Sequence, residues 1–206
     1  MVICYNAGVK KGKLITFYGI NNIGKTTQCL RLVKRLQDAG FDAVYTKYPK
    51  YDLAPSGPFL NKILRGSVKN KQKISEEELQ MWFAINRYQY QPEIEKMLAQ
   101  GKIVVAEDYT GTGLAWGWLK GAKLEWLEEV NKHLIKEDLA ILLEGKRFLH
   151  AKEMSHIHES DDALVEKCKK IHATLGKKYS WKVLNVEPSK EKTEEMIWKV
   201  IEKFLR

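Results

Sequence analysis

Short apolar runs recur along the chain at intervals that suit the strands of a buried sheet. The first run, Leu14–Tyr18, ends at Gly19, and four more follow it. Short continuous apolar runs bounded by turn residues are typical of strands that are covered on both faces. The sequence therefore predicts five strands, at residues 14–18, 41–46, 103–106, 139–143 and 181–186.

Between these runs, apolar residues recur every three or four positions, which is the spacing of an amphipathic helix. Helices are expected at residues 26–39, 56–64, 75–90, 124–134, 160–177 and 189–205. Ser75 and Glu78 have the capping-box spacing at the start of one helix. Pro92 is expected to start or kink the next segment, which Gly101 closes.

Strands and helices alternate from one end of the chain to the other. This order favours an α/β fold in which helices cover both faces of a parallel sheet. We expect a single domain over residues 1–206, with three α/β/α layers around a five-stranded parallel sheet. Ligands of such sheets bind at the carboxyl ends of the strands.

A phosphate-binding motif follows the first strand. The segment Gly19–Thr26 reads GINNIGKT and matches G-x-x-x-x-G-K-[ST] in full, between a predicted strand and a predicted helix. Its glycines let the backbone N–H groups wrap around phosphates. Lys25 is expected to reach the β- and γ-phosphates of ATP, and the Thr26 hydroxyl to ligate Mg²⁺. The motif predicts a P-loop NTPase that binds ATP through Gly19, Asn22, Ile23, Gly24, Lys25, Thr26 and Thr27.

The composition is that of a globular protein with excess positive charge. Of the 206 residues, 44% are hydrophobic and 30% are charged, and the net charge is +9. Lys and Arg are dispersed among Asp and Glu, which favours an enzyme with phosphate-bearing ligands over a nucleic-acid-binding module. The three cysteines indicate neither a disulfide framework nor a zinc site. No apolar run suits a membrane span or a signal peptide, so a cytoplasmic enzyme is expected.

Several segments resemble the thymidylate kinases, in the same order along the chain. They are the P-loop with its Gly-Lys-Thr-Thr-Gln ending, Thr46–Pro49, Phe83–Arg87, Glu107–Tyr109 and the pair Ala115-Trp116. Phe83–Arg87 resembles the family's Phe-x-x-Asn/Asp-Arg helix motif. The resemblance implies a nucleoside monophosphate kinase that transfers the terminal phosphate of ATP to thymidine monophosphate, giving thymidine diphosphate and ADP. It also implies a homodimer, which the helix bearing Trp82 and Phe83 would help to form.

The same resemblance implies roles on the acceptor side. Phe83 would stack on the pyrimidine ring, and Arg87, one helical turn away, would donate to a thymine carbonyl. Lys47 would contact the acceptor phosphate. Asn21 would bind the sugar hydroxyl, and Trp116 would lie near the deoxyribose.

Each of these residues has a structural alternative. Phe83 and Trp116 could be ordinary core aromatics. Arg87 could form a surface ion pair with Glu93. Lys47 could be a solvated lysine.

Glu107 and Asp108 differ from the family's Asp-Arg pair at the same place. The Glu107 carboxylate could hold Mg²⁺ together with Thr26, or orient the acceptor oxygen. Asp108 occupies the position of a family arginine that holds the acceptor phosphate. Because a carboxylate repels a phosphate unless a metal or a lysine intervenes, a deoxynucleoside kinase remains an alternative.

A lid is expected after the fourth strand, at approximately residues 144–160. Asn22 stands where some family members carry a catalytic arginine, so Arg147 is expected to supply the positive charge on the migrating phosphoryl group. Arg147 could instead pair with Glu144 or Glu153. A metal site at the lid histidines is a less favoured alternative: His150, His156 and His158.

The catalytic set expected is Lys25, Arg147 and Glu107. Another nucleoside monophosphate kinase is a further alternative to the thymidylate kinase. A third possibility is a P-loop regulator without turnover, although the sequence has no guanine-specificity motif of the Asn-Lys-x-Asp type.

Overall fold

Five parallel strands form the centre of the domain, in the computed structural model that describes residues 11–65, 74–147 and 162–206. The sheet order is β2 (Ala43–Lys47), β3 (Ile103–Glu107), β1 (Lys13–Tyr18), β4 (Leu139–Glu144) and β5 (Lys182–Asn185). Every neighbouring pair is parallel, so the carboxyl ends of all five strands lie along one edge. The three central strands are almost entirely buried, which explains their uninterrupted apolar runs. The prediction of a five-stranded parallel sheet is confirmed.

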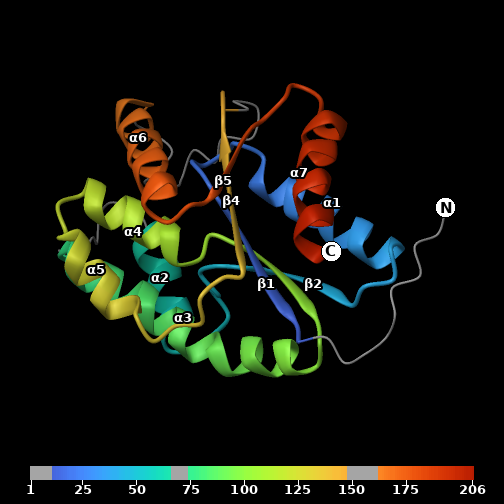
Figure 1. Cartoon of the computed structure of the whole chain (residues 1–206). Coiled ribbons are helices and arrows are strands. Elements are labelled where there is room, and N and C mark those ends of the chain that lie inside the picture. The colour runs from blue at the N-terminus through green and yellow to red at the C-terminus, as the bar shows by residue number, and fades with distance from the viewer. Residues whose placement is uncertain (1–10, 66–73, 148–161) are drawn as a thin grey trace.

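Helices cover both faces of the sheet and complete three layers (Figure 1). One face carries α1 (Lys25–Asp38) and α7 (Lys190–Leu205), which also pack against each other. The other helices lie on the opposite side of the sheet: α2 (Ser56–Arg65), α3 (Glu76–Ala99), α4 (Thr110–Leu119), α5 (Leu124–Asn131) and α6 (Asp162–Lys178).

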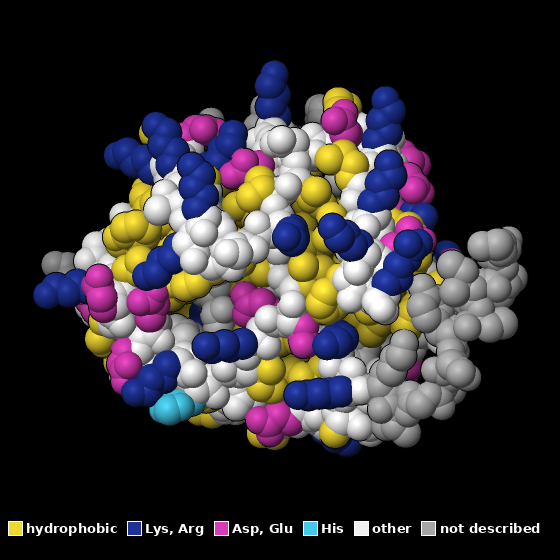
Figure 2. Space-filling model, viewed as in Figure 1, with side chains coloured by type: hydrophobic (Ala, Val, Ile, Leu, Met, Phe, Trp, Pro, Cys, Tyr) yellow, Lys and Arg dark blue, Asp and Glu magenta, His cyan; other side chains and the backbone are white. Residues whose placement is uncertain are grey.

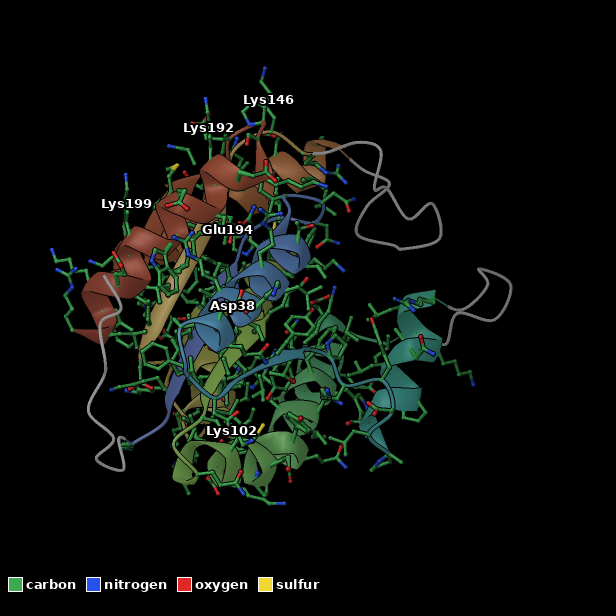
Figure 3. The ribbon with its side chains drawn as sticks, turned by 90° about the vertical axis from the view of Figure 1, so that its right-hand side faces the viewer. Asp38, Lys102, Lys146, Lys192, Glu194 and Lys199 are labelled. Carbon is green, nitrogen blue, oxygen red and sulfur yellow. The ribbon has the colours of Figure 1, made fainter. Side chains whose placement is uncertain are left out.

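Ion pairs join α1 to α7. The Arg31 guanidinium lies 2.6 Å from the Glu194 carboxylate, and Arg35 lies 2.6 Å from Glu195. Figure 3 shows Glu194 on the side of α7 that meets α1, whereas Lys192 and Lys199 point outward. Because such partly exposed pairs contribute about 0–1 kcal/mol each, they orient α7 more than they stabilise it.

The surface charge is dispersed, as the sequence indicates. On the face shown in Figure 2, Lys and Arg side chains are scattered and interspersed with Asp and Glu. Among the described residues, no helix is both long and apolar enough to cross a membrane.

The helix α3 continues through Pro92, where the sequence predicts a start or a kink. Proline removes one helical hydrogen bond, and this costs about 3 kcal/mol in an isolated helix. Here α3 also packs against β3, α4 and α5, and this burial offsets the loss. At its start, the Ser75 hydroxyl accepts a hydrogen bond from the Glu78 N–H at 3.1 Å, so the expected N-cap is confirmed.

The helix α4 is not predicted by the sequence, because three of its ten residues are glycines. Close packing leaves no room for a side chain at any of these three glycines. A Cβ atom at Gly111 would lie 2.6 Å from the Trp181 ring, and one at Gly113 would lie 2.4 Å from the Arg87 guanidinium. One at Gly117 would lie 2.8 Å from Leu127. Tertiary packing therefore overrides the low helix propensity of this segment.

A buried histidine, His172 of α6, lies outside the residues that the sequence assigns to chemistry. Its Nδ1 is 3.0 Å from the Cys168 carbonyl oxygen, and its Nε2 is buried without a hydrogen-bond partner in the described part of the chain. Burial lowers the pKa of His172 to about 4. The ring therefore stays neutral in the folded protein at pH values where an unfolded chain binds a proton.

We expect the free energy of unfolding to fall as the pH decreases from about 6.5 towards about 4, because in this range only the unfolded chain protonates this histidine. By about pH 5 the loss should be on the order of 2 kcal/mol. Chemical denaturation near pH 7 and pH 5 measures it. His172→Gln should reduce the difference between the two pH values, whereas the exposed control His133→Gln should keep it. Equal differences in all three proteins would contradict this role of His172.

Candidate active site

One cavity opens at the carboxyl edge of the sheet. Its volume is about 720 Å³. Its walls come from the loop after β1 and the start of α1, the loop after β2, the end of α2, the middle of α3, the segment from Glu107 to Trp116, and the loop before α7. The loops that follow four strands, β1, β2, β3 and β5, therefore meet α2 and α3 at the carboxyl edge of the sheet, which is where α/β sheets bind their ligands.

The P-loop forms one end of this cavity. Gly19, Asn22 and Gly24 all have positive φ angles, of 134°, 62° and 96°, so the chain turns sharply before α1 begins at Lys25. A Cβ atom at Gly19 would lie 2.5 Å from the Leu143 carbonyl oxygen, which excludes any larger residue there. Asn21–Thr27 line the cavity, whereas Gly19 lies beneath it.

Lys25 is held rigidly although it is charged and only 5% exposed. Its Nζ donates to the carbonyl oxygens of Gly19 at 2.8 Å and Ile20 at 3.1 Å. The Asp108 carboxylate lies 3.5 Å from the same Nζ. A buried ammonium needs such partners, and these three place it at the mouth of the P-loop.

Two carboxylates and two lysines alternate in the centre of the cavity. Glu107 Oε1 lies 2.9 Å from Lys47 Nζ and accepts a hydrogen bond from the Thr26 hydroxyl at 2.8 Å. Asp108 faces Lys25 and accepts from the Thr112 hydroxyl at 2.9 Å. The expected acceptor-side lysine and both carboxylates are therefore brought together with the P-loop.

The two carboxylates differ in how readily they bind a proton. Burial raises the pKa of Asp108; Lys25 opposes this, and the neighbouring Glu107 adds to it. Burial acts on Glu107 as well, but Lys25, Lys47 and the hydrogen bond from Tyr45 hold its pKa below its usual value. Relative to an exposed side chain of the same type, the site therefore favours the charged form of Glu107 and disfavours the charged form of Asp108.

Thr26 and Glu107 together suit a hard divalent cation. A hydroxyl oxygen and a carboxylate oxygen 2.8 Å apart, beside a phosphate-binding loop, are the oxygen donors that Mg²⁺ prefers. No group of three or more His, Cys, Asp or Glu suited to a metal occurs among the residues that the structure describes. Any cation at Thr26 and Glu107 would therefore need further oxygen ligands from a substrate or from water.

Aromatic and cationic side chains line the other end of the cavity. Phe83 is half-buried on α3 and faces the cavity, so it is not an ordinary core aromatic. Trp116 is 5% exposed, lines the cavity and also belongs to the core, so the core-packing alternative is confirmed and its place near a deoxyribose stays a prediction. These two rings lie on α3 and α4, which pack together.

Arg87 is buried, which contradicts the alternative of a surface ion pair with Glu93. It is 4% exposed, and its guanidinium donates to the Asn131 side-chain oxygen. Glu93 lies instead beside Lys96. Burial lowers the pKa of Arg87, while the surrounding tyrosines, Tyr109 foremost, oppose this. A buried guanidinium that faces a cavity has N–H groups to offer to a ligand.

Asn86, within the Phe83–Arg87 motif, fixes the loop that follows β2. Its side chain accepts from the Lys50 N–H at 2.7 Å and donates to the Lys50 carbonyl at 3.0 Å and the Ser56 hydroxyl at 2.8 Å. The sequence places this asparagine in the Phe83–Arg87 motif but predicts no role for it. A buried amide that bonds both the N–H and the C=O of one loop residue locks the loop against α3.

The sequence assigns no role to the other cavity residues. They are Gln28, Tyr48, Pro49, Tyr51, Leu64, Arg65, Gln80, Tyr109, Thr112, Gly113, Glu187, Pro188 and Lys190. A few of them lie in the segments that resemble the family, whereas loops and helix ends bring in the rest from distant positions.

The lid prediction falls mostly outside the described residues. Arg147 is described, but it is not among the residues that line the cavity. Glu153 and the lid histidines lie outside the described part of the chain: His150, His156 and His158. The role of Arg147 stays a prediction.

Comparisons with known proteins identify the family. The family model for thymidylate kinase matches residues 17–197. A protein named "Probable thymidylate kinase" from Pyrococcus horikoshii is 35% identical over 136 residues, a segment that spans 65% of either chain. The human protein named "Thymidylate kinase" is 27% identical over 202 residues, 96% of this chain and 93% of that one.

A solved structure agrees with the fold. The thymidylate kinase from Candida albicans superposes with a TM-score of 0.79 over 94% of this chain and 92% of that chain, at 20% sequence identity. Because the family model covers residues 17–197, from the P-loop to the last helix, this chain belongs to the thymidylate kinase family of nucleoside monophosphate kinases.

Proposed function

We propose that the protein transfers the γ-phosphoryl group of ATP to thymidine monophosphate, giving ADP and thymidine diphosphate. A single observation carries this proposal. One cavity of about 720 Å³ joins the P-loop to the half-buried Phe83 and the buried Arg87. Two nucleotides entering from opposite ends would meet with their phosphates at Lys25, Lys47 and Glu107.

The P-loop end would bind ATP. The N–H groups of residues 19–27 and the start of α1 would surround the β- and γ-phosphates, with Lys25 beside them. Thr26 and Glu107 would hold Mg²⁺, which supplies charge neutralisation on the phosphates when it is bound. The phosphate oxygens would share Lys25 with Asp108, which already lies 3.5 Å from it.

The other end would bind the acceptor. Phe83 would stack on the pyrimidine, and Arg87 would donate to a ring carbonyl in a site with little competing water. Asn21 would hydrogen-bond the sugar hydroxyl, and Trp116 would pack on the deoxyribose. Lys47 would face the acceptor phosphate.

In the transfer, an oxygen of the acceptor phosphate forms a bond to the γ-phosphorus, and the bond from that phosphorus to the β–γ bridging oxygen breaks. The enzyme has little covalent chemistry to perform, so position and charge decide the rate. Lys25 would stabilise charge on the migrating group and Glu107 would orient the reactants through Lys47 and Thr26. Arg147 is our candidate for a further cation from the lid.

Asp108 favours a second candidate. Asp108 lies between β3 and α4, where the family resemblance places an arginine for the acceptor phosphate. An uncharged acceptor, a deoxynucleoside, would meet no repulsion there. A P-loop regulator without turnover is the third reading.

A coupled assay of ADP release separates these readings. Thymidine monophosphate should give the highest kcat/KM, ahead of thymidine and of the other nucleoside monophosphates. Turnover with thymidine but not with its monophosphate would establish the second reading instead. ADP release that no acceptor stimulates would leave only the regulator.

Lys25→Ala should lower kcat by about a hundredfold or more, because it removes positive charge from the migrating phosphoryl group. Lys34→Ala, an exposed lysine of the same helix, is the matched control and should keep full activity. Circular dichroism should show both variants folded. Full activity of Lys25→Ala would contradict the role of the P-loop.

We also propose a homodimer that forms through α3. Met81 and Ile85, one helical turn apart, expose 49% and 36% of their surfaces. Light scattering should give twice the 23.9 kDa of the chain. The double variant Met81→Lys, Ile85→Lys should be monomeric, whereas Leu30→Lys, at an equally exposed site on α1, should stay dimeric. A monomeric unmodified chain would refute the dimer.

A further inference from the structure

Lys47, Tyr51 and Arg65 lie together on the acceptor side of the cavity. They come from the end of β2, the loop after it and the end of α2, and all three line the cavity. The Arg65 guanidinium lies over the Tyr51 ring, 4.9 Å from its centroid. Burial alone would lower the pKa of Lys47, but Glu107 and Asp108 raise it above its usual value. Tyr51 raises it as well. The phenol ring therefore contacts one cation, Arg65, and all three side chains line the same cavity.

The fold fixes both supports of this group. Asn86 locks the Lys50 peptide on one side of Tyr51, so the loop is tied to α3. Leu64, the residue before Arg65, is only 2% exposed, which anchors the last turn of α2. The stack on Tyr51 then limits the rotamers of an otherwise exposed arginine. Arg65 is therefore held at the cavity wall by the buried end of its own helix, α2, and by the Tyr51 ring in the loop after β2.

The chemistry of the group suits a phosphate monoester. A guanidinium binds phosphate oxygens through two parallel N–H donors, and an ammonium and a phenol O–H supply further donors. The start of α4 cannot supply this charge, because Asp108 carries the opposite sign and faces Lys25. The nearby carboxylates draw Lys47 towards Glu107, at 2.9 Å, so a second cation is needed to hold a doubly charged acceptor.

We propose that Arg65, stacked on Tyr51 and acting with Lys47, is the acceptor-phosphate subsite of this enzyme. The inference rests on the proposed function, since it names the residues that hold the phosphate of the same acceptor. It assigns to the end of α2 the charge that the residue at position 108 does not provide. Arg65 is thus a specificity-determining residue, which favours the monophosphate over the nucleoside.

The assignment is tested by comparing how variants of the protein bind acceptors with and without the phosphate. Calorimetry measures the binding of thymidine monophosphate and of thymidine to the full chain, to Arg65→Gln, to Arg65→Lys and to the control Lys62→Gln. Lys62 is an exposed cation on the same helix and does not line the cavity. We expect Arg65→Gln to weaken monophosphate binding about tenfold or more, because a charge-assisted hydrogen bond is lost. Thymidine binding and the KM for ATP should stay within about twofold.

Arg65→Lys should keep part of the preference for the monophosphate, because it retains the charge but loses the planar fork. If Arg65→Gln does not fold, Arg65→Lys decides the question: the proposal requires a smaller but measurable loss of monophosphate binding with thymidine binding unchanged. The proposal is overturned if Arg65→Gln binds thymidine monophosphate within about twofold of the unmodified chain. It is also overturned if the variant loses the same factor of affinity for thymidine as for thymidine monophosphate. The binding results test the subsite only if the unmodified chain phosphorylates thymidine monophosphate. If the unmodified chain does not phosphorylate it, the proposed function is refuted instead of the subsite.

Discussion

The ammonium of Lys25 is the charge on which the rest of the site depends. It is almost completely buried, and an isolated buried cation is unfavourable by several kcal/mol. Its partners are two carbonyl oxygens of the turn after β1 and the Asp108 carboxylate after β3. Satisfying one charge therefore joins the P-loop to the neighbouring strand. The same neighbouring strand places Glu107 against Thr26 and Lys47.

The sequence carries the signals for the sheet and the phosphate loop because both are local. Continuous apolar runs identify the five strands, and the glycines of Gly19–Thr26 are needed within eight residues of one another. The family resemblance points to Phe83 and Arg87, and the i, i+4 spacing predicts that they share a face of one helix; both line the cavity. The sequence does not predict how far each side chain is buried. Whether the Arg87 guanidinium meets water or Asn131 depends on the end of α5, since Asn131 lies 44 residues further along the chain.

What the sequence did not indicate depends on packing between distant segments. The segment Thr110–Leu119 has poor helix propensity, and only the presence of Trp181, Arg87 and Leu127 explains its glycines. Arg65 resembles any other surface arginine until Tyr51 is placed beneath it. The role of Asn86 likewise requires the Lys50 peptide, which a helix motif does not predict. Propensity and periodicity report on neighbours in sequence, and these three features are set by neighbours in space.

The glycines of α4 also limit how the molecule can move. Gly111 meets the sheet side at Tyr18 and Trp181, Gly113 meets α3 at Arg87, and Gly117 meets α5 at Leu127. A helix whose backbone touches its neighbours at three glycines cannot slide or rotate without steric collision there, since no flexible side chain separates the backbone from its neighbour at these points. The helix α4, together with α3 and the sheet, therefore forms a rigid frame. Any closure around the two nucleotides of the proposed reaction would have to be made by segments outside that frame, and the proposed acceptor base would meet a wall that is already in place.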